Sequence, residues 1–415
     1  MGSHLYEAKY NKFKKLCVKM IPRKCITLAL TNKILPMHQR IPGFDLARAY
    51  AIFGMFIVNF NFSFGTFGSP SATGRFLNLF IGNSTAIFII CAGMGLSLMI
   101  SGSENKLNEE KKKYRSVILK RSWFLFGLGL LLYNWWPGDI LHFYGGYMHI
   151  AAFLLFADNK KLLLIALAAI AAFHILHFLI PIQTGWDPLT RYVDFWTVQG
   201  FLRNTFYNGW NSIFPWLAYF LLGMWLGRLN WKDGALRRKI FVAALVCFLL
   251  FQAVRWFAVY RQFNREVMDY IMCDYFPPYL PFMILTSSFA LMVITACIWL
   301  GDKFNGALPV KWLADTGKMT LTLYVLHVTL GMLLLEAISG RQYTGFLQTQ
   351  HPVDPFHILV YAALFFIASL AFSALWTKYF GRGPLEILMR KFSDSPPLRK
   401  SVTLSNNNKG KSLRF

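Results

Sequence analysis

Charged residues are scarce in this chain. They make up 15% of its 415 residues, whereas hydrophobic residues make up 55%. A soluble globular protein is about one-quarter charged, so this composition excludes an ordinary soluble domain of the same length. The first 44 residues also lack a short apolar core followed by a small-residue cleavage site, and we expect no cleavable signal peptide. The composition therefore predicts a polytopic membrane protein.

Cysteines and the motifs of soluble enzymes are sparse too. The six cysteines have neither metal-ligand nor disulfide-framework spacing, so we expect reduced structural thiols. No GxSxG, Walker loop, HExxH or paired-cysteine motif is present. His174 and His177 have the spacing of a metal-binding pair, but no third ligand is near them in the sequence. We expect no metal.

Long apolar runs are what the sequence has in quantity. Ten segments approach the roughly 20 residues that a helix needs to cross a hydrocarbon core. They stay apolar throughout instead of alternating with polar residues, which indicates helices rather than membrane strands. The expected fold is an all-α bundle of about ten transmembrane helices, over residues 45–66, 76–101, 117–136, 139–157, 161–182, 212–229, 238–259, 279–301, 316–338 and 356–380.

The formal net charge of +24 is concentrated in a few segments. With ten helices, the most basic segments fall on one side of the membrane: residues 1–40, 104–121, 228–239 and 389–415. By the positive-inside rule that side is cytoplasmic, and so are both termini. Topology and attraction to anionic lipid account for the basic excess, so we expect membrane lipids as partners and no nucleic acid.

Three parts are expected along the chain. Residues 1–40 form a basic cytoplasmic segment, residues 41–392 the transmembrane domain, and residues 393–415 a basic, disordered cytoplasmic tail. Within the first part, residues 11–36 mix basic and apolar side chains as an interfacial helix does, although a flexible basic arm fits equally well.

Ionisable residues are rare in the predicted helices, and each is a functional candidate because burying it in a membrane is costly. Asp45 and Arg48 lie three residues apart at the cytoplasmic boundary of the first helix and can pair. They predict either an anion-binding mouth or a helix start with a snorkelling arginine. Arg382 and Glu386 lie at the same level, where the last helix ends. This inner cluster suits a phosphate-bearing cofactor.

The stretch GDILHFYGGYMHI places an aspartate and two histidines at the outer end of an apolar helix. His142 follows Asp139 by three residues, so the carboxylate can orient the imidazole as in general acid–base catalysis. Alternatively, Asp139 only caps the helix and the histidines bond to neighbouring groups. His149 lies two turns further along the same face.

Other polar residues join this outer cluster. His327 lies well inside the ninth predicted helix, three residues after Tyr324. Asn59, in the outer third of the first helix, is either a helix-packing amide or an active-site amide. Three further candidates surround the start of the sixth helix: Asn208, Asn211 and Trp216. The combination of Asn, Asp, His and Trp suits an uncharged polar acceptor.

Five blocks carry a resemblance to a known family. They are RIPGFDLARAYAIFGMFIVN, GDILHFYG, NGWNSIFPWLAYFLLGMWLGR, GKMTLTLYVLH and GRGPLEILMRK, spread over residues 40–392. Their content and order resemble the YeiB-like bacterial membrane proteins, distant relatives of heparan-α-glucosaminide N-acetyltransferase among the transmembrane acyltransferases. Most YeiB-like proteins have no assigned reaction, so the blocks indicate membership more strongly than activity.

The resemblance implies transfer of an acetyl group from cytosolic acetyl-CoA to an amino sugar across the membrane. Asn59 matches an asparagine at the end of the relative's first helix, and His327 matches a histidine in its penultimate helix. The relative's catalytic histidine in the following loop has no counterpart in FNFSFGTFGSPSATGRF. Either His142 or His327 is then the base, or the reaction differs, or there is none.

The sequence therefore predicts an acyltransferase of the bacterial inner membrane that moves an acyl group, with acetyl as the first candidate, from acyl-CoA to a hydroxyl or amine at the outer side. A glycan is one candidate acceptor. The alternative is a non-catalytic transporter or a small-molecule or lipid-binding protein on the same fold. Helix glycines permit a homodimer.

The catalytic candidates are His142, Asp139, His327 and Asn59. The cofactor-binding candidates are Arg48, Asp45, Arg382 and Tyr324. The substrate-binding candidates are Asn208, Asn211, Trp216 and His149.

Overall fold

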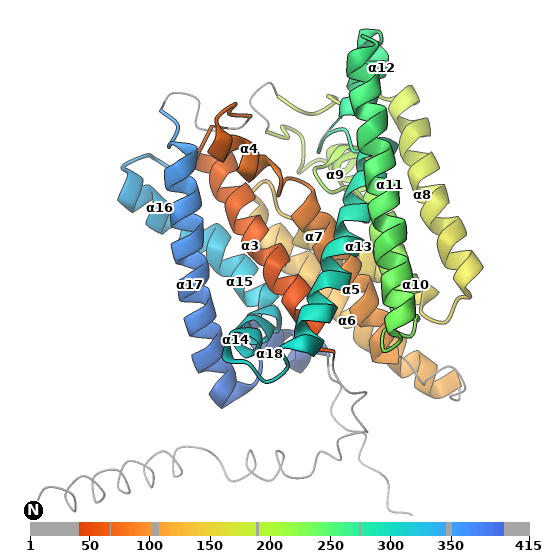
Figure 1. The fold of residues 1–415 in the computed structure, drawn as a ribbon, viewed down its shortest axis with the longest axis vertical. Helices are drawn as coiled ribbons and strands as arrows, with labels where there is room; N and C mark the ends of the chain where they lie inside the picture. The colour runs from red at the N-terminus through yellow and green to blue at the C-terminus, as the bar shows by residue number, and fades with distance from the viewer. Residues whose placement is uncertain are drawn as a thin grey trace, which may run out of the picture. The chain divides into compact units, whose positions relative to one another are not determined.

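The computed structural model describes residues 41–66, 68–100, 108–187, 191–273, 275–345 and 351–393. Apart from isolated bridges, every regular secondary-structure element within these ranges is a helix (Figure 1). What the sequence predicted for residues 1–40 and 394–415 lies outside the described residues. The elements are α3 Pro42–Phe64, α4 Ala72–Asn78, α5 Asn83–Ile100, α6 Asn108–Tyr133, α7 Leu141–Leu154, α8 Asn159–Leu179, α9 Val198–Arg203, η1 Asn204–Asn208, α10 Ile213–Leu226, α11 Gly234–Tyr260, α12 Arg265–Met272, α13 Leu280–Lys303, α14 Leu308–Gly317, α15 Thr320–Leu326, η2 His327–Gly331, α16 Met332–Ser339, α17 Pro355–Phe380 and α18 Pro384–Ser393.

Eight of the described helical segments are long and apolar enough to cross a membrane. The all-α polytopic fold is therefore confirmed. The helices α7 and α10, which the sequence predicted as spans, have only 14 residues each. The ninth span was predicted to begin at residue 316, but α14 ends at Gly317 and α15 begins at Thr320, so that boundary was wrong.

The long helices alternate in direction along the chain and divide the transmembrane unit into two ends (Figure 1). One end carries most of the Lys and Arg side chains and is called the basic end; it comprises residues 42–48, 108–121, 155–161, 226–239, 301–322 and 380–393. The opposite end is rich in Trp, Tyr and Phe and is called the aromatic end; it comprises residues 64–66, 133–140, 180–187, 191–212, 260–273 and 339–345. By the positive-inside rule we expect this basic end to face the cytoplasm.

The helix α3 lies at the centre of the bundle, against α5, α13, α14 and α17. In the most apolar stretch of α3, 72% of the residues are buried, whereas in that of α11 only 6% are buried. A helix that exposes apolar side chains all round has its faces toward lipid, so α11 belongs to the periphery. Gly43 allows α3 to approach α13, because a β-carbon there would overlap the backbone of Ile298.

Candidate functional site

Asp139 and His142 form a closed pair at the start of α7. Oδ2 of Asp139 lies 3.0 Å from Nδ1 of His142 and also accepts the backbone N–H of His142 at 3.0 Å. Both side chains are 0% exposed. Because the carboxylate can only accept, Nδ1 carries the proton, and Nε2 of the neutral ring holds a lone pair. That Nε2 has no hydrogen-bond partner among the described residues.

The close packing of α6 against α7 shapes this pair. Gly129 of α6 faces it directly, and a β-carbon at Gly129 would overlap both Oδ2 of Asp139 and the backbone N of His142. Asp139 lies just before α7 and His142 lies in the first turn of α7, so the spacing of three residues brings the two side chains together, as the sequence predicted.

Tyr324 of α15 holds the other oxygen of the carboxylate. Its hydroxyl donates to Oδ1 of Asp139 at 3.4 Å and accepts the backbone N–H of Ile140 at 3.2 Å. Tyr324 is buried, with its ring centroid 5.1 Å from that of His327. The sequence predicted Tyr324 as a cofactor ligand, but it lies beside the Asp139–His142 pair. Its hydrogen bond joins two positions that are 185 residues apart in the sequence.

His327 is occupied at both ring nitrogens. Nδ1 lies 3.2 Å from the carbonyl oxygen of Leu323, and Nε2 lies 2.9 Å from Nδ2 of Asn59. A carbonyl only accepts, so Nδ1 donates to it and Nε2 of the neutral ring accepts the Asn59 amide N–H. The two residues that match the relative therefore bond to each other.

His327 also begins the π-helical turn η2. A π-turn leaves backbone carbonyls without their usual helical partners, and such turns often occur at functional sites. Trp135 Nε1 donates to the carbonyl of Val328 at 2.6 Å, and Tyr361 donates its hydroxyl to that of Gly331 at 2.6 Å. Aromatic side chains from two other segments thus fix the turn that carries His327.

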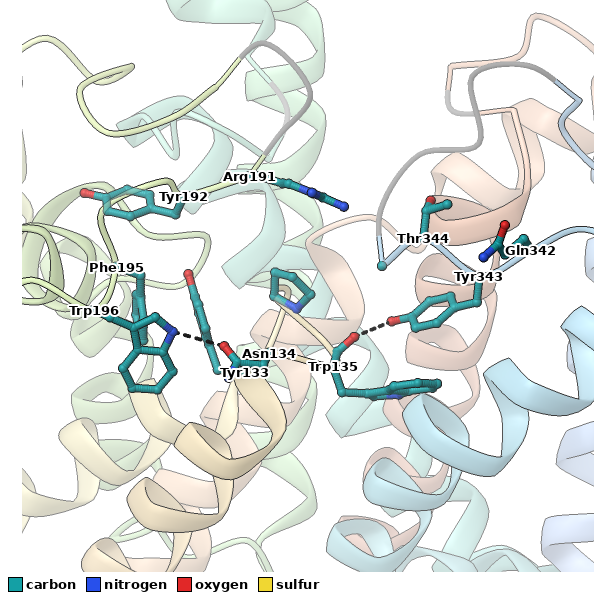
Figure 2. A pocket seen from close by; sticks show the side chains of 12 residues that line it. Tyr133, Asn134, Trp135, Arg191, Tyr192, Phe195, Trp196, Gln342, Tyr343 and Thr344 are labelled. Atoms are coloured by element: carbon teal, nitrogen blue, oxygen red, sulfur yellow. Dashed lines mark hydrogen bonds between the residues drawn. The ribbon is translucent and has the colours of Figure 1, made fainter.

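A cavity of about 570 Å³ opens at the aromatic end. Three separate segments line it: the turn after α6, the segment after residue 190, and the segment after α16 (Figure 2). The hydroxyl of Tyr343 donates to the carbonyl of Trp135 at 2.8 Å, and Trp196 Nε1 donates to Oδ1 of Asn134 at 3.0 Å. Its lining residues are Tyr133, Asn134, Trp135, Pro137, Arg191, Tyr192, Phe195, Trp196, Gln342, Tyr343, Thr344 and Gly345.

Two stacked rings separate this cavity from His142. The centroids of Tyr133 and Phe195 lie 3.5 Å apart with an angle of 13° between the ring planes, and both residues line the cavity. Each ring centroid is also 5.8 Å from that of His142. The His142 ring, which carries the unpartnered nitrogen, therefore lies one aromatic layer from the cavity.

Asn208, predicted to bind substrate, supports the cavity wall instead of lining it. It accepts the hydroxyl of Tyr192 at 2.7 Å and donates to the carbonyls of Ile182 and Thr184 at 3.0 and 2.8 Å. Arg203 Nε donates to the same tyrosine oxygen at 2.8 Å. Burial raises the pKa of Tyr192 to about 12, so at neutral pH its hydroxyl remains a donor to Asn208.

Asn211 and Trp216 belong to a neighbouring buried group, outside the lining of the cavity. Oδ1 of Asn211 accepts the hydroxyl of Tyr275 at 2.9 Å, and the ring of Trp216 lies 5.3 Å from that of Tyr275. Within the ranges that the structure describes, Nδ2 of Asn211 and Nε1 of Trp216 have no hydrogen-bond partner. The structure therefore divides the predicted outer cluster into two groups.

The remaining histidine candidates lie away from the cavity. His149 contacts Ser122 of α6, with Nδ1 3.2 Å from the hydroxyl oxygen. His174 and His177 contact Tyr270 and Tyr279 at 3.3 and 2.8 Å. Among the described residues, no group of three or more His, Cys, Asp or Glu side chains could hold a metal ion.

Asp45 and Arg48 pair at the basic end at 3.4 Å, and Arg48 also donates to the carbonyl of Cys91 at 3.1 Å. The Arg48 side chain keeps 25% of its surface exposed, and Gly95 leaves the space that its guanidinium occupies. A partly exposed guanidinium with only two N–H groups engaged fits a phosphate, as a CoA ester requires. Arg382 lies in the exposed turn between α17 and α18.

Glu386 is half-buried beside the start of α15. It accepts the backbone N–H groups of Leu321 and Thr322 at 2.8 and 3.2 Å, and the Thr322 hydroxyl at 2.6 Å. Burial raises the pKa of Glu386 above its ordinary 4.5, although these hydrogen bonds lower it in part. This carboxyl therefore supports the helix that carries Tyr324.

Reasoning from the sequence did not identify the lining of the cavity. Its residues come from three loops, and none of them recurs at a helical or motif spacing. The available signal was compositional: Trp, Tyr and Phe are dense in the segments 133–136, 192–196 and around 343. Such density at a membrane boundary is also typical of an interfacial aromatic belt. By itself it does not distinguish the lining of a cavity from such a belt.

An all-helical membrane bundle with a buried carboxylate–imidazole pair beneath an aromatic cavity is consistent with the transmembrane acyltransferases, and two known families match the chain. A family described as heparan-alpha-glucosaminide N-acetyltransferase, catalytic, matches residues 40–258, and one described as protein of unknown function (DUF418) matches residues 223–395. No curated protein matches the chain.

The first match covers more than half of the 415 residues, so the chain belongs to the heparan-alpha-glucosaminide N-acetyltransferase catalytic family. The second match supports the YeiB-like relationship that the sequence blocks indicated. The chain is thus an integral membrane protein of a transmembrane acetyltransferase-like family.

Proposed function

We propose that this protein transfers an acyl group, with acetyl as the first candidate, from a CoA thioester at the basic end to a hydroxyl or amine acceptor at the aromatic end. The observation that carries the proposal is the Asp139–His142 pair, whose Nε2 is buried without a partner beside the lined cavity. A buried acceptor nitrogen with no donor is costly, which favours a site that a reacting O–H or N–H completes.

The Asp139–His142 pair supplies the general base. As the acceptor oxygen or nitrogen forms its bond to the thioester carbonyl carbon, Nε2 of His142 takes the acceptor proton. Asp139 keeps the proton on Nδ1 and stabilises the imidazolium that forms. When the bond between carbon and sulfur breaks, the imidazolium returns the proton to the CoA thiolate. Tyr324 holds the carboxylate in place during both transfers.

His142 is favoured over His327 as the base because its Nε2 is free, whereas Nε2 of His327 accepts from Asn59. The same contact engages an N–H of the Asn59 amide, which makes Asn59 a poorer donor to a developing oxyanion. The stack of Tyr133 and Phe195 closes His142 off from the cavity, so the proposed reaction requires these rings to part.

The basic end is the proposed entrance for the acyl donor. Acetyl-CoA would bring an activated thioester, and Arg48, with its partly exposed guanidinium, would bind a phosphate of the donor. Arg382 adds positive charge at the end of α17. Asp45 would orient Arg48 through the contact at 3.4 Å.

The test begins with the donor. Calorimetry on the purified protein in detergent compares acetyl-CoA, free CoA and desulfo-CoA, with Arg48→Ala measured alongside. Binding of acetyl-CoA that weakens about tenfold or more in Arg48→Ala supports the proposal, since a lost charged hydrogen bond is worth roughly 1.5–3 kcal/mol. No binding to a folded sample would contradict it and favour the transporter or binding-protein alternative.

A further inference from the structure

The helix α18 lies at the basic end, where α17 ends (Figure 1). Its sequence PLEILMRKFS places apolar and basic side chains together. Leu388 and Phe392 are 51% and 55% exposed although both are large and apolar, and their spacing of four residues puts them on one face. Lys391 is exposed beside them, three residues after Leu388. An exposed apolar stripe edged by a basic side chain is typical of a helix that lies at a membrane surface.

Arg390, on the same helix, has no hydrogen-bond or ion-pair partner for its guanidinium in the ranges that the structure describes. The residue is half-buried, and its Nε is shielded from solvent without an acceptor. The one carboxylate of α18, on Glu386, binds the start of α15 instead. A buried N–H without an acceptor is costly, so this arginine indicates an acceptor that comes from outside the chain.

The helix α6 fixes the end of α18 that carries this arginine. Nε of Arg121 donates to the hydroxyl of Ser393 at 3.2 Å, and that hydroxyl donates to the carbonyl of Arg390 at 3.1 Å. The ring centroid of Phe124 lies 5.8 Å from that of Phe392. A second guanidinium is therefore bonded to the last turn of α18, and the apolar and basic side chains of that turn are held by a neighbouring helix.

We infer that this surface of α18 and α6 binds an anionic phospholipid of the leaflet at the basic end. Arg390 and Lys391 bind the headgroup phosphate, and Leu388 and Phe392 contact the acyl chains. The phosphate supplies the acceptor that Nε of Arg390 lacks. A free phosphate ion would meet the cations alone, whereas a phospholipid also covers the exposed apolar pair. The inference is independent of the proposed function, because it requires no reaction.

The experiment measures lipid binding to the purified full-length protein in detergent by native mass spectrometry. The probes are phosphatidylglycerol and phosphatidylcholine with the same acyl chains, of which only the first has a net charge, because the choline ammonium neutralises the phosphate of the second. We expect the first phosphatidylglycerol to bind about tenfold or more tightly, as two basic residues at a membrane surface allow. Arg390→Gln should remove most of that preference and Lys391→Gln part of it, whereas Arg390→Lys should keep part of it.

The matched control is Lys232→Gln, because Lys232 is an exposed cation at the same end, between α10 and α11. It should keep the preference for phosphatidylglycerol. Equal binding of the two lipids, or an unchanged preference in both Arg390→Gln and Lys391→Gln, would overturn the inference. Lys391 is exposed, so its substitution tests the site even where the Arg390 variant does not fold.

Two further measurements separate the lipid from other sources of phosphate. Glycerol phosphate, which has no acyl chains, should not displace phosphatidylglycerol, and displacement would show a site for free phosphate instead. Acetyl-CoA binding to Arg390→Gln, measured by calorimetry, should equal that of the wild type. Loss of that binding would assign the cations to the phosphates of the donor and overturn the lipid site, whereas failure of the proposed function would leave the lipid preference intact.

Discussion

Nδ1 of His142 lies 3.0 Å from Oδ2 of Asp139, and the opposite nitrogen of the same ring has no partner. One side of the imidazole is therefore fixed and the other is available, as a general base requires. In contrast, both nitrogens of His327 are engaged. The geometry thus favours His142 over His327 as the general base, a choice that the sequence left open.

His142→Asn should lower acyl transfer about 100-fold or more, which is the lower range for loss of a general base. The asparagine amide can still donate to Asp139, so the fold is expected to persist, but nothing replaces Nε2. The readout is release of CoA thiol in proteoliposomes that contain acetyl-CoA and glucosamine as a test acceptor. His149→Asn, two turns along the same helix, is the control and should keep the wild-type rate; an active His142→Asn enzyme would remove His142 from its assigned role.

His327 and Asn59 should behave as a structural pair. Asn59→Ala leaves the buried His327 ring without its partner, at a cost of about 1–3 kcal/mol, and His327→Ala leaves the half-buried Asn59 amide without its partner. The double variant should lose less stability than the sum of the single variants, because the two side chains share one contact. Thermal unfolding in detergent measures this coupling, and strictly additive losses would show that the 2.9 Å contact does not contribute.

Gly129→Ala should disturb the catalytic pair without altering either of its members. The added β-carbon overlaps Asp139 and His142, so the two must move apart from α6. Gly127→Ala is a matched control one half-turn away, because a β-carbon at Gly127 meets nothing within 4 Å. Acyl transfer should fall in Gly129→Ala and persist in Gly127→Ala, and equal activity in the two variants would contradict the close approach of the helices.

Glu386 predicts a dependence of stability on pH. Its pKa is raised in the folded protein, so the folded state binds more protons between the ordinary value of 4.5 and the raised value. Stability therefore falls as the pH rises through that interval. Glu386→Gln should flatten this fall in thermal unfolding curves, whereas Glu109→Gln, which changes an exposed carboxyl, should not. Identical pH profiles for wild type and Glu386→Gln would show that burial leaves this group unperturbed.

Contacts within one helical turn could be predicted from the sequence because spacing alone decides them. Asp45 with Arg48 and Asp139 with His142 are both three residues apart, and both pairs are in contact. The bond between Asn59 and His327 joins positions 268 residues apart, and no local pattern encodes it. The resemblance pointed to both residues but not to their contact.

The cavity illustrates the same limit. The turn after α6 contributes Trp135 and the segment after α16 contributes Tyr343, and they meet only because α6 and α16 end at the same side of the bundle. Such a site depends on how helices are arranged in space. The bundle itself was predictable because apolar length decides it, and the π-turn at His327 was not, because its sequence remains as apolar as its neighbours.

The carboxylate of Glu386 binds N–H groups at the start of α15, although it comes from a helix 65 residues later in the chain. A helix usually has its first N–H groups bound by a residue just before it, and α15 has no such side-chain cap. During synthesis the segment that carries Tyr324 and His327 must therefore wait for α18 to emerge from the ribosome before its first turn is complete. Assembly of the bundle and completion of the helix that carries Tyr324 are thus one late event.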